Sequence, residues 1–505
     1  MFRQIKTFAL DGINAYTVNV EVDISRGLPS FGIIGLPDAS VKEAKDRLHS
    51  ALVNSGFQFP SKKILINLAP ASIKKAGTQF DLAMALGILL ASNQIRAEGF
   101  KQTLFTGELS LSGDLKPVDG VLPAMLHAVQ KNIARIFLPK ENSLEASAVK
   151  GVEILPTGSL RRLAEHLTGN LRLEPFSCSQ AEGVAKPDYS DFRDVQNQSF
   201  VKRALEVAAA GGHNVIMIGP PGAGKTMLAA RLPGILPPMT QDEAVETTCV
   251  YSASGLLKKG TGLIWTRPWR SPHHTISDVA LVGGGANARP GEISLAHNGV
   301  LFLDEFPEFH RNVIEVLRGP MEDGKITIAR VRGRNTFPAS FMLVASMNPC
   351  PCGYYGHPSK ECVCTPYQIK KYRAKISGPI MDRIDIQVEV PALPFDKIYT
   401  QAPEEDSQII RHRVSSARRR ALSRLKNMKG VYTNARIDSS DVKKICGVTG
   451  GGMELLRKAV EIFSISRRAV DKVLKVARTI ADLADCENIK DEHVAEALQY
   501  RLDET

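Results

Sequence analysis

The chain has 505 residues, of which 43% are hydrophobic and 23% charged, and its formal net charge is +11. This composition is ordinary for a globular protein, and the length allows about two to four domains. No apolar run is long enough to span a membrane and the first residues lack a signal-peptide core, so we expect a cytoplasmic protein with no membrane partner. The positive charge favours a polyanionic partner such as DNA, although many basic proteins bind no nucleic acid.

Residues 1–170 mix strand-like and helix-like runs, which predicts an α/β domain. Strands are predicted at 16–24, 64–68 and 135–138, and helices at 40–54 and 80–92. Residues 171–190 contain prolines, serines and other polar residues, which is typical of a linker.

A phosphate-binding loop follows the apolar run at 215–218 and precedes a helix-like run at 227–232. Its residues are Gly219, Pro220, Pro221, Gly222, Ala223, Gly224, Lys225 and Thr226. Strand, glycine loop and helix is the context that this motif requires, because the backbone N–H groups then converge on phosphate oxygens at a helix N-terminus. We expect Lys225 to contact the β- and γ-phosphates of ATP and Thr226 to hold Mg²⁺.

Two more strands of this domain are predicted to end in polar residues. The run at 300–303 precedes Asp304 and Glu305, and the run at 341–345 leads to Asn348. Apolar runs of this length are typical of a parallel sheet covered on both faces by helices. We predict that Asp304 joins the Mg²⁺ shell, that Glu305 polarises the attacking water and that Asn348 positions water or senses the γ-phosphate.

Four cysteines, Cys350, Cys352, Cys362 and Cys364, form a C-x-C-x9-C-x-C cluster directly after Asn348. In a reducing compartment this cluster favours a Zn²⁺ site over disulfides, with unligated or redox-active thiols as the alternative. A metal here would fix the loop that leaves the active-site strand. The other four cysteines, Cys178, Cys249, Cys446 and Cys486, are predicted to be structural.

Two basic segments are candidates for DNA contact. Residues 329–335 predict a β-hairpin that carries Arg330, Arg332 and Arg334. The segment at 240–290 contains basic and aromatic residues, a combination that suits single strands; they are Lys258, Lys259, Trp265, Arg267, Trp269 and Arg270. The alternatives are a solvated hairpin or an interface between subunits.

The ATPase core is predicted to span 191–394 and to be followed by a helical domain at 395–505. Its helices are predicted at 407–429, 453–463, 469–483 and 491–502. The arginine-rich first helix is expected to be a solvated face of this domain.

Together these motifs resemble the AAA+ ATPases and, more narrowly, the magnesium-chelatase-like ComM/YifB family. The narrower resemblance rests on the segments at 270–277, 291–299 and 324–333 and on the cysteine cluster. It implies an AAA+ core with a helical lid, ATP and Mg²⁺ as cofactors, and a ring-forming motor, usually hexameric, that drives DNA branch migration in natural transformation.

The resemblance also implies roles for two arginines. Arg383, in the segment 377–385, matches the arginine finger, although a local ion pair with Asp382 or Asp385 is the alternative. Arg468 matches the second sensor arginine of the lid. Asn197 stands where the family has glycine, and we expect little loss because asparagine tolerates left-handed backbone geometry.

The N-terminal domain resembles the proteolytic domain of Lon proteases. Gln79 falls at the position of the nucleophilic serine and Leu122 at that of the lysine base. Because an amide and an alkyl chain can neither attack a carbonyl nor accept a proton, the resemblance implies an inactive domain.

The leading hypothesis is therefore an ATP-dependent hexameric DNA helicase or translocase that promotes branch migration. The alternatives are the ATPase subunit of a metal chelatase and a protein-remodelling motor.

Overall fold

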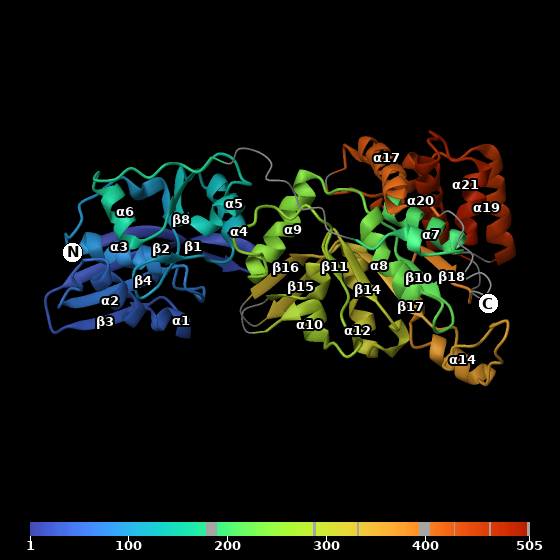
Figure 1. Cartoon of the computed structure of the whole chain (residues 1–505), viewed down its shortest axis with the longest axis horizontal. Helices are drawn as coiled ribbons and strands as arrows, with labels where there is room; N and C mark the ends of the chain where they lie inside the picture. The colour runs from blue at the N-terminus through green and yellow to red at the C-terminus, as the bar shows by residue number, and fades with distance from the viewer. Residues whose placement is uncertain are drawn as a thin grey trace.

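A computed structural model describes residues 1–177, 189–285, 289–330, 333–392, 404–428, 430–463 and 466–501. The molecule is elongated, with the N-terminal domain at one end, the central core in the middle and the C-terminal helices at the other end (Figure 1). Much of the predicted linker at 171–190 lies outside these residues, as do Cys178 and Arg332. Within them, no helix is long and apolar enough to cross a membrane.

A seven-stranded sheet organises the N-terminal domain in the order β3-β4-β2-β1-β5-β8-β9. Its strands are β1 Phe2–Asp11, β2 Asn14–Ser25, β3 Ser30–Ile34, β4 Lys63–Ala69, β5 Thr103–Phe105, β8 Arg135–Pro139 and β9 Glu153–Thr157. Strands β1 and β2 form an antiparallel hairpin, while β5, β8 and β9 pair in parallel. The predicted α/β domain is thereby confirmed.

Helices cover this sheet because their apolar residues match its buried positions. Every residue of α3 is buried, which explains its nearly continuous apolar sequence. The helices are α1 Ala39–Lys42, α2 Ala44–Asn54, α3 Asp81–Ala91, α4 Val121–Gln130, α5 Ser143–Ala146 and α6 Leu160–Leu167. A short pair, β6 Glu108–Leu109 and β7 Leu115–Lys116, lies outside the main sheet.

The core is a five-stranded parallel sheet in the order β11-β14-β17-β10-β18. Its strands are β11 Trp269–Arg270, β14 Val300–Leu303, β17 Met342–Met347, β10 Val215–Ile218 and β18 Ile386–Glu389. All residues of β14 and β17 are buried, as expected for strands covered on both faces. Since parallel strands end at one edge, the residues after β10, β14 and β17 come together there.

Helices and smaller pairs surround the core sheet. The helices are α7 Ser199–Gly211, α8 Lys225–Ile235, α9 Gln241–Ser254, α10 Asp278–Val282, α11 Glu292–Leu295, α12 Arg311–Val316, α13 Arg318–Asp323, α14 Pro366–Arg373 and α15 Gly378–Met381. The strand pairs are β12 Gly283–Gly284 with β13 Arg289–Pro290, and β15 Lys325–Arg330 with β16 Gly333–Pro338. Asn197 before α7 has a φ of 57°, which bears out the expected left-handed geometry.

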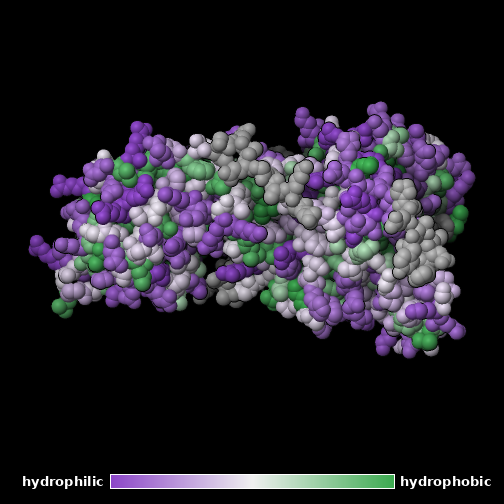
Figure 2. Space-filling view, in the orientation of Figure 1, coloured by the Kyte–Doolittle hydropathy of each residue, from purple (hydrophilic) through white to green (hydrophobic). Residues whose placement is uncertain are grey.

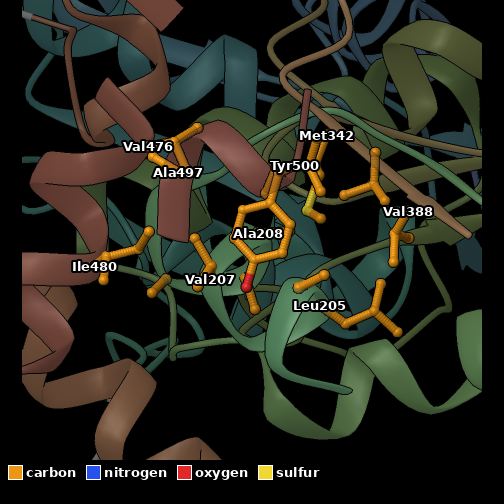
Figure 3. Packing of buried hydrophobic residues seen from close by; sticks show 14 of the residues in the cluster. Leu205, Val207, Ala208, Met342, Val388, Val476, Ile480, Ala497 and Tyr500 are labelled. Carbon is orange, nitrogen blue, oxygen red and sulfur yellow. The ribbon is translucent and has the colours of Figure 1, made fainter. Parts of the chain in front are cut away.

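The C-terminal region is helical, as predicted. It contains α17 Ser407–Leu425, α18 Ser439–Ile445, α19 Gly450–Phe463, α20 Arg467–Leu483 and α21 Asp491–Gln499. Tyr500, fully buried, packs together with Leu205 of α7, Val388 of β18 and Ala497 of α21 (Figure 3). Core and lid therefore share one hydrophobic cluster.

Helix α9 joins the core to the N-terminal domain. The Gly120 N–H donates to the Ser252 carbonyl at 3.1 Å, and the Ser252 hydroxyl donates to the Glu145 carboxylate. Burial raises the pKa of Glu145, which also accepts the Leu122 N–H at 2.8 Å. This joint between the two domains is therefore polar although it is buried. On the outer surface, hydrophilic side chains cover most of the visible face (Figure 2).

Candidate functional site

The phosphate-binding loop lies between β10 and α8, at the carboxyl edge of the core sheet. Gly222 and Gly224 have φ values of 80° and 87°, a left-handed geometry that glycine adopts without strain. Gly224 directly precedes the first turn of α8, so the backbone N–H groups of that turn are open to an anion. A side chain at Gly219 would clash with the Val390 carbonyl. The loop thus has the local geometry of a phosphate cradle.

Lys225 is largely buried and its ammonium group points back into the loop. Its Nζ donates to the Gly219 carbonyl at 2.6 Å and the Pro220 carbonyl at 2.9 Å. It also lies 3.2 Å from Oδ1 of Asn348, which brings these two predicted residues together. Burial lowers the pKa of Lys225, while the charges of Asp304 and Glu305 act in the opposite direction.

The hydroxyl of Thr226 donates to Oδ2 of Asp304 at 2.7 Å. The other carboxylate oxygen of Asp304 accepts from the hydroxyl of Ser346, a β17 residue that sequence reasoning missed. A hydroxyl and a carboxylate in contact at this edge are oxygen ligands of the kind that Mg²⁺ takes beside a nucleotide. The donor set therefore fits the predicted metal.

Glu305 lies beside this pair and is exposed to solvent. Its backbone has a φ of 51°, and its N–H donates to Asp304 Oδ1 at 3.1 Å. Oε2 of its carboxylate lies 3.7 Å from Nδ1 of His274. His274 belongs to the segment at 270–277 that carries the family resemblance, and the sequence alone gave it no catalytic role.

The four clustered cysteines converge directly behind the phosphate loop. All four sulfur atoms lie within 4.8 Å of one another, and Cys350 and Cys362 are 3.7 Å apart. Ligands of a tetrahedral Zn²⁺ ion with bonds of about 2.3 Å are separated by about 3.8 Å, so the spacing fits a tetrathiolate site. A Cβ added at Gly353 would lie 2.6 Å from Pro221, so this loop touches the phosphate loop.

Backbone N–H groups already point at these sulfurs. The Tyr354 N–H, followed by the Cys350 side chain, lowers the pKa of the Cys352 thiol to about 6. The Tyr355 N–H donates to the sulfur of Cys350 at 3.3 Å. These contacts favour the thiolate form of Cys352, whereas desolvation and the neighbouring cysteine side chains raise the pKa of Cys362 and Cys364.

Arg383 lies at the opposite edge of the core sheet. Its carbonyl accepts from the Asn214 side chain at 2.9 Å, and Asn214 precedes β10 whereas the phosphate loop follows it. The four residues of β10 separate these two points by about 13 Å. Arg383 therefore does not reach the phosphate loop of its own chain. It pairs instead with Glu322, and not with Asp382 or Asp385.

Arg468 is exposed and belongs to the same edge. The pKa of Glu322 is lowered chiefly by the hydrogen bond and the charge of Arg383, and further by the charge of Arg468. Lys472, one turn later in α20, contacts Asp385 at 2.9 Å. The two predicted arginines thus lie together, away from the loop that their own chain provides.

The basic segments have different surroundings. The predicted hairpin is present as β15–β16 and Arg334 is exposed, while the side chain of Arg330 is not among those described. Lys258 and Lys259 are exposed beside the N-terminal domain, where the Gly260 N–H donates to the Glu141 carbonyl.

Three further residues of the segment at 240–290 serve the fold instead. Trp269 stacks on Phe302 with ring centroids 5.4 Å apart, and Arg270 pairs with Glu292 at 2.6 Å. Arg267 pairs with the buried Glu243 at 2.9 Å. These contacts favour a structural role for the three residues, and DNA contact by them stays a prediction.

The N-terminal domain contains no serine or lysine at its two Lon-like positions. Gln79 donates to the Ala76 carbonyl at 2.9 Å, and the side chain of Leu122 is fully buried. The backbone around Leu122 forms the joint with α9 described above. Both the substituted residues and the occupied joint argue against peptide hydrolysis there.

Comparisons with known proteins agree with this geometry. The family model for magnesium chelatase subunit ChlI matches residues 191–398, and models for two further ChlI segments match 20–142 and 404–501. The YifB protein of Escherichia coli K12 is 42% identical over 98% of this chain and 96% of its own length. Competence protein ComM of Haemophilus influenzae is 43% identical over 97% and 95% respectively. Lon protease 2 of Bacillus subtilis is 28% identical over 26% of this chain and 23% of its own.

The phosphate loop, the acidic strand end and the helical lid agree with the similarity over nearly the full length. The chain belongs to the ComM/YifB family of magnesium-chelatase-like AAA+ proteins.

Proposed function

We propose that this protein is an ATP-dependent DNA motor that drives branch migration of recombination intermediates, working as a ring, most simply a hexamer. The observation that carries the proposal is the contact of Thr226 with Asp304 beside Lys225, in a chain similar over nearly its full length to a competence protein. This combination supports both energy conversion and a role with incoming DNA.

In the proposed reaction, Lys225 exchanges its carbonyl partners for the β- and γ-phosphates. Thr226 and Asp304 hold the Mg²⁺ that neutralises phosphate charge. Glu305 orients and polarises a water for in-line attack on the γ-phosphate, and Asn348, in contact with Lys225, keeps the ammonium group aligned.

The positions of Arg383 and Arg468 support action across a subunit boundary. Both lie at the sheet edge opposite the phosphate loop, so each loop must receive them from a neighbouring chain. A guanidinium supplied in this way stabilises the charge of the transition state. Hydrolysis would then depend on assembly, which is how ring motors couple neighbouring sites.

DNA contact is assigned to the β15–β16 hairpin through Arg330, Arg332 and Arg334, and secondarily to Lys258 and Lys259. Asn335 of this hairpin packs near Gly12 of the N-terminal domain. A Cβ atom added to Gly12 would lie 3.4 Å from the Cβ atom of Asn335. The inactive domain is thereby proposed as a collar beside the DNA-contacting hairpin. The cysteine cluster is proposed to hold a structural Zn²⁺ behind the phosphate loop.

The test is an assay of ATP turnover and strand displacement with single-stranded, three-stranded and four-way DNA. We expect branched DNA to stimulate turnover and to be migrated only with ATP and Mg²⁺. Turnover that is unaffected by any DNA, with no displaced strand, would refute the proposal.

A second candidate, the ATPase subunit of a metal chelatase, is favoured by the description of the matching family model. It predicts stimulation by a chelatase partner rather than by DNA, so the same assay separates the two candidates. A protein-remodelling motor predicts stimulation by unfolded protein instead.

A further inference from the structure

A small cavity of about 50 Å³, partly open to solvent, lies where the core meets the helical lid. Gly299 and Met342 border it at the start of two core strands, and Tyr432 and Thr433 border it from the lid. This is the edge opposite the phosphate loop. The cavity is therefore separate from the nucleotide site.

The charged side chains that line this cavity are three arginines, Arg267, Arg418 and Arg436, and one carboxylate, Glu243. Arg267 and Glu243 neutralise each other through a two-pronged pair with distances of 2.9 and 3.0 Å. Among the described residues, no carboxylate contacts Arg418 or Arg436. The lining thus keeps a surplus of two positive charges.

Both surplus arginines donate to carbonyl groups rather than to anions. Arg418 contacts the carbonyls of Ala209 and Ala210 at the end of α7, at 3.3 and 3.1 Å, and the carbonyl of Tyr432 at 3.3 Å. Arg436 contacts those of Met321 and Phe341 at 3.0 and 3.4 Å. A helix C-terminus supplies only about half a negative charge, so these contacts leave each guanidinium partly uncompensated.

Burial makes this surplus costly. Arg418 is 6% exposed, and desolvation, followed by the charge of Arg267, lowers its pKa to about 9. Buried charges in proteins are normally paired, because an unpaired one loses its hydration without recovering it elsewhere. The cavity lacks the negative partner that this rule requires.

A further polar atom in the lining lacks a partner. The Thr433 hydroxyl is buried and has no hydrogen-bond partner among the described residues. A buried hydroxyl of this kind is normally satisfied by protein, water or ligand. Thr433 lines the same cavity as Arg418 and Arg436, where its hydroxyl offers a further donor for an oxyanion.

We propose that this cavity binds a phosphate group, held by Arg418, Arg436 and Thr433, and that the bound anion ties the lid to the core. Guanidinium groups recognise phosphate through paired, charge-assisted hydrogen bonds, and a tetrahedral dianion matches the surplus charge. The group comes either from free phosphate or from a nucleoside monophosphate. This proposal does not depend on the proposed DNA motor function.

The test measures thermal unfolding of the full chain in a Lys225→Ala background, which weakens the nucleotide loop as a competing phosphate site. Inorganic phosphate and 5′-AMP are titrated separately, with chloride at matched ionic strength as the baseline. We expect Tm to rise with the logarithm of the phosphate concentration above the Kd, by roughly 3 °C at about 100-fold the Kd. A response to both ligands identifies a phosphomonoester site, and a response to phosphate alone identifies a site for the free ion.

Three added substitutions decide whether the cavity is responsible. Arg436→Gln removes one surplus charge, and Thr433→Val removes the unpartnered hydroxyl while keeping the side-chain volume. Arg457→Gln removes an exposed arginine of α19 that does not line the cavity. We expect the first two to weaken phosphate binding at least about tenfold, measured calorimetrically, and the third to leave it unchanged.

Phosphate also stabilises proteins without binding to a site. A rise in Tm of equal size in all variants, or no heat of binding in the Lys225→Ala chain, would overturn the proposal. Thr433→Val is conservative enough to keep the test decisive should Arg436→Gln fail to fold.

Discussion

Nδ1 of His274 lies 3.7 Å from Oε2 of Glu305, so the carboxylate that is proposed to orient water faces a histidine. Both side chains are partly exposed, and a pair of this kind contributes about 1 kcal/mol at most. If the contact restrains Glu305, His274→Ala should raise ATP turnover in the absence of DNA by up to about fivefold.

His273→Ala is the matched control for this substitution. His273 stacks on His274 with centroids 4.1 Å apart, and it contacts Thr275 rather than Glu305. We expect a smaller change in its DNA-independent turnover. An equal effect of both substitutions, or lower turnover in His274→Ala, would contradict a restraining role.

Lys225→Ala and Glu305→Gln should separate nucleotide binding from hydrolysis. Lys225 is the buried ammonium group of the loop, so its loss should abolish binding of a fluorescent ATP analogue. Glu305→Gln keeps the shape but loses the base, and we expect retained binding with turnover reduced about 10²–10⁴-fold. Undiminished turnover in Glu305→Gln would remove this residue from its role.

Arg383→Ala should reduce turnover about 10³–10⁵-fold if the arginine acts as a finger. Because it would act on a neighbour, the variant can be complemented. An Arg383→Ala chain has an intact loop, and a Lys225→Ala chain has an intact arginine. Mixing the two inactive variants should restore measurable turnover.

No recovery in mixed assemblies, despite co-assembly shown by light scattering, would contradict action between subunits. Full turnover of Arg383→Ala alone would assign the arginine to its ion pair with Glu322 only. The same mixture made with Arg468→Ala tests the second arginine.

Removal of the proposed zinc should loosen the phosphate loop. The purified chain is expected to contain about one Zn²⁺, lost in Cys362→Ser and retained in Cys486→Ser, a cysteine outside the cluster. Because the cysteine loop contacts Pro221, we expect weaker ATP binding as well as a lower Tm in Cys362→Ser. Absence of metal by elemental analysis would leave four free thiols and refute the site.

The phosphate loop, Asp304 and Asn348 lie at the ends of the strands that the sequence predicted, because these features are local. Eight consecutive residues specify the phosphate loop, and apolar runs specify the strands that carry Asp304 and Asn348. Parallel pairing then brings these residues to one edge without further information. The contact of Thr226 with Asp304 follows from this topology.

Contacts between distant segments were less predictable. The sequence pattern of Trp269 and Arg270 does not distinguish a DNA surface from a packed strand. The contacts of these residues with Phe302 and Glu292, which only the fold reveals, favour the packed strand. Ser346 and His274 meet the acidic residues through the fold alone. The arginine-lined cavity joins helix, strand and lid residues more than 200 positions apart, which no local pattern reveals.

The joint at Ser252 has a consequence for any attempt to build a peptidase on the N-terminal domain. Placing a serine at 79 and a lysine at 122 would not suffice, because position 122 is fully buried and its backbone is bonded to Glu145. A new ammonium group there would be enclosed by protein, out of reach of any polypeptide. Attachment to the core thus blocks this position independently of the residue that occupies it.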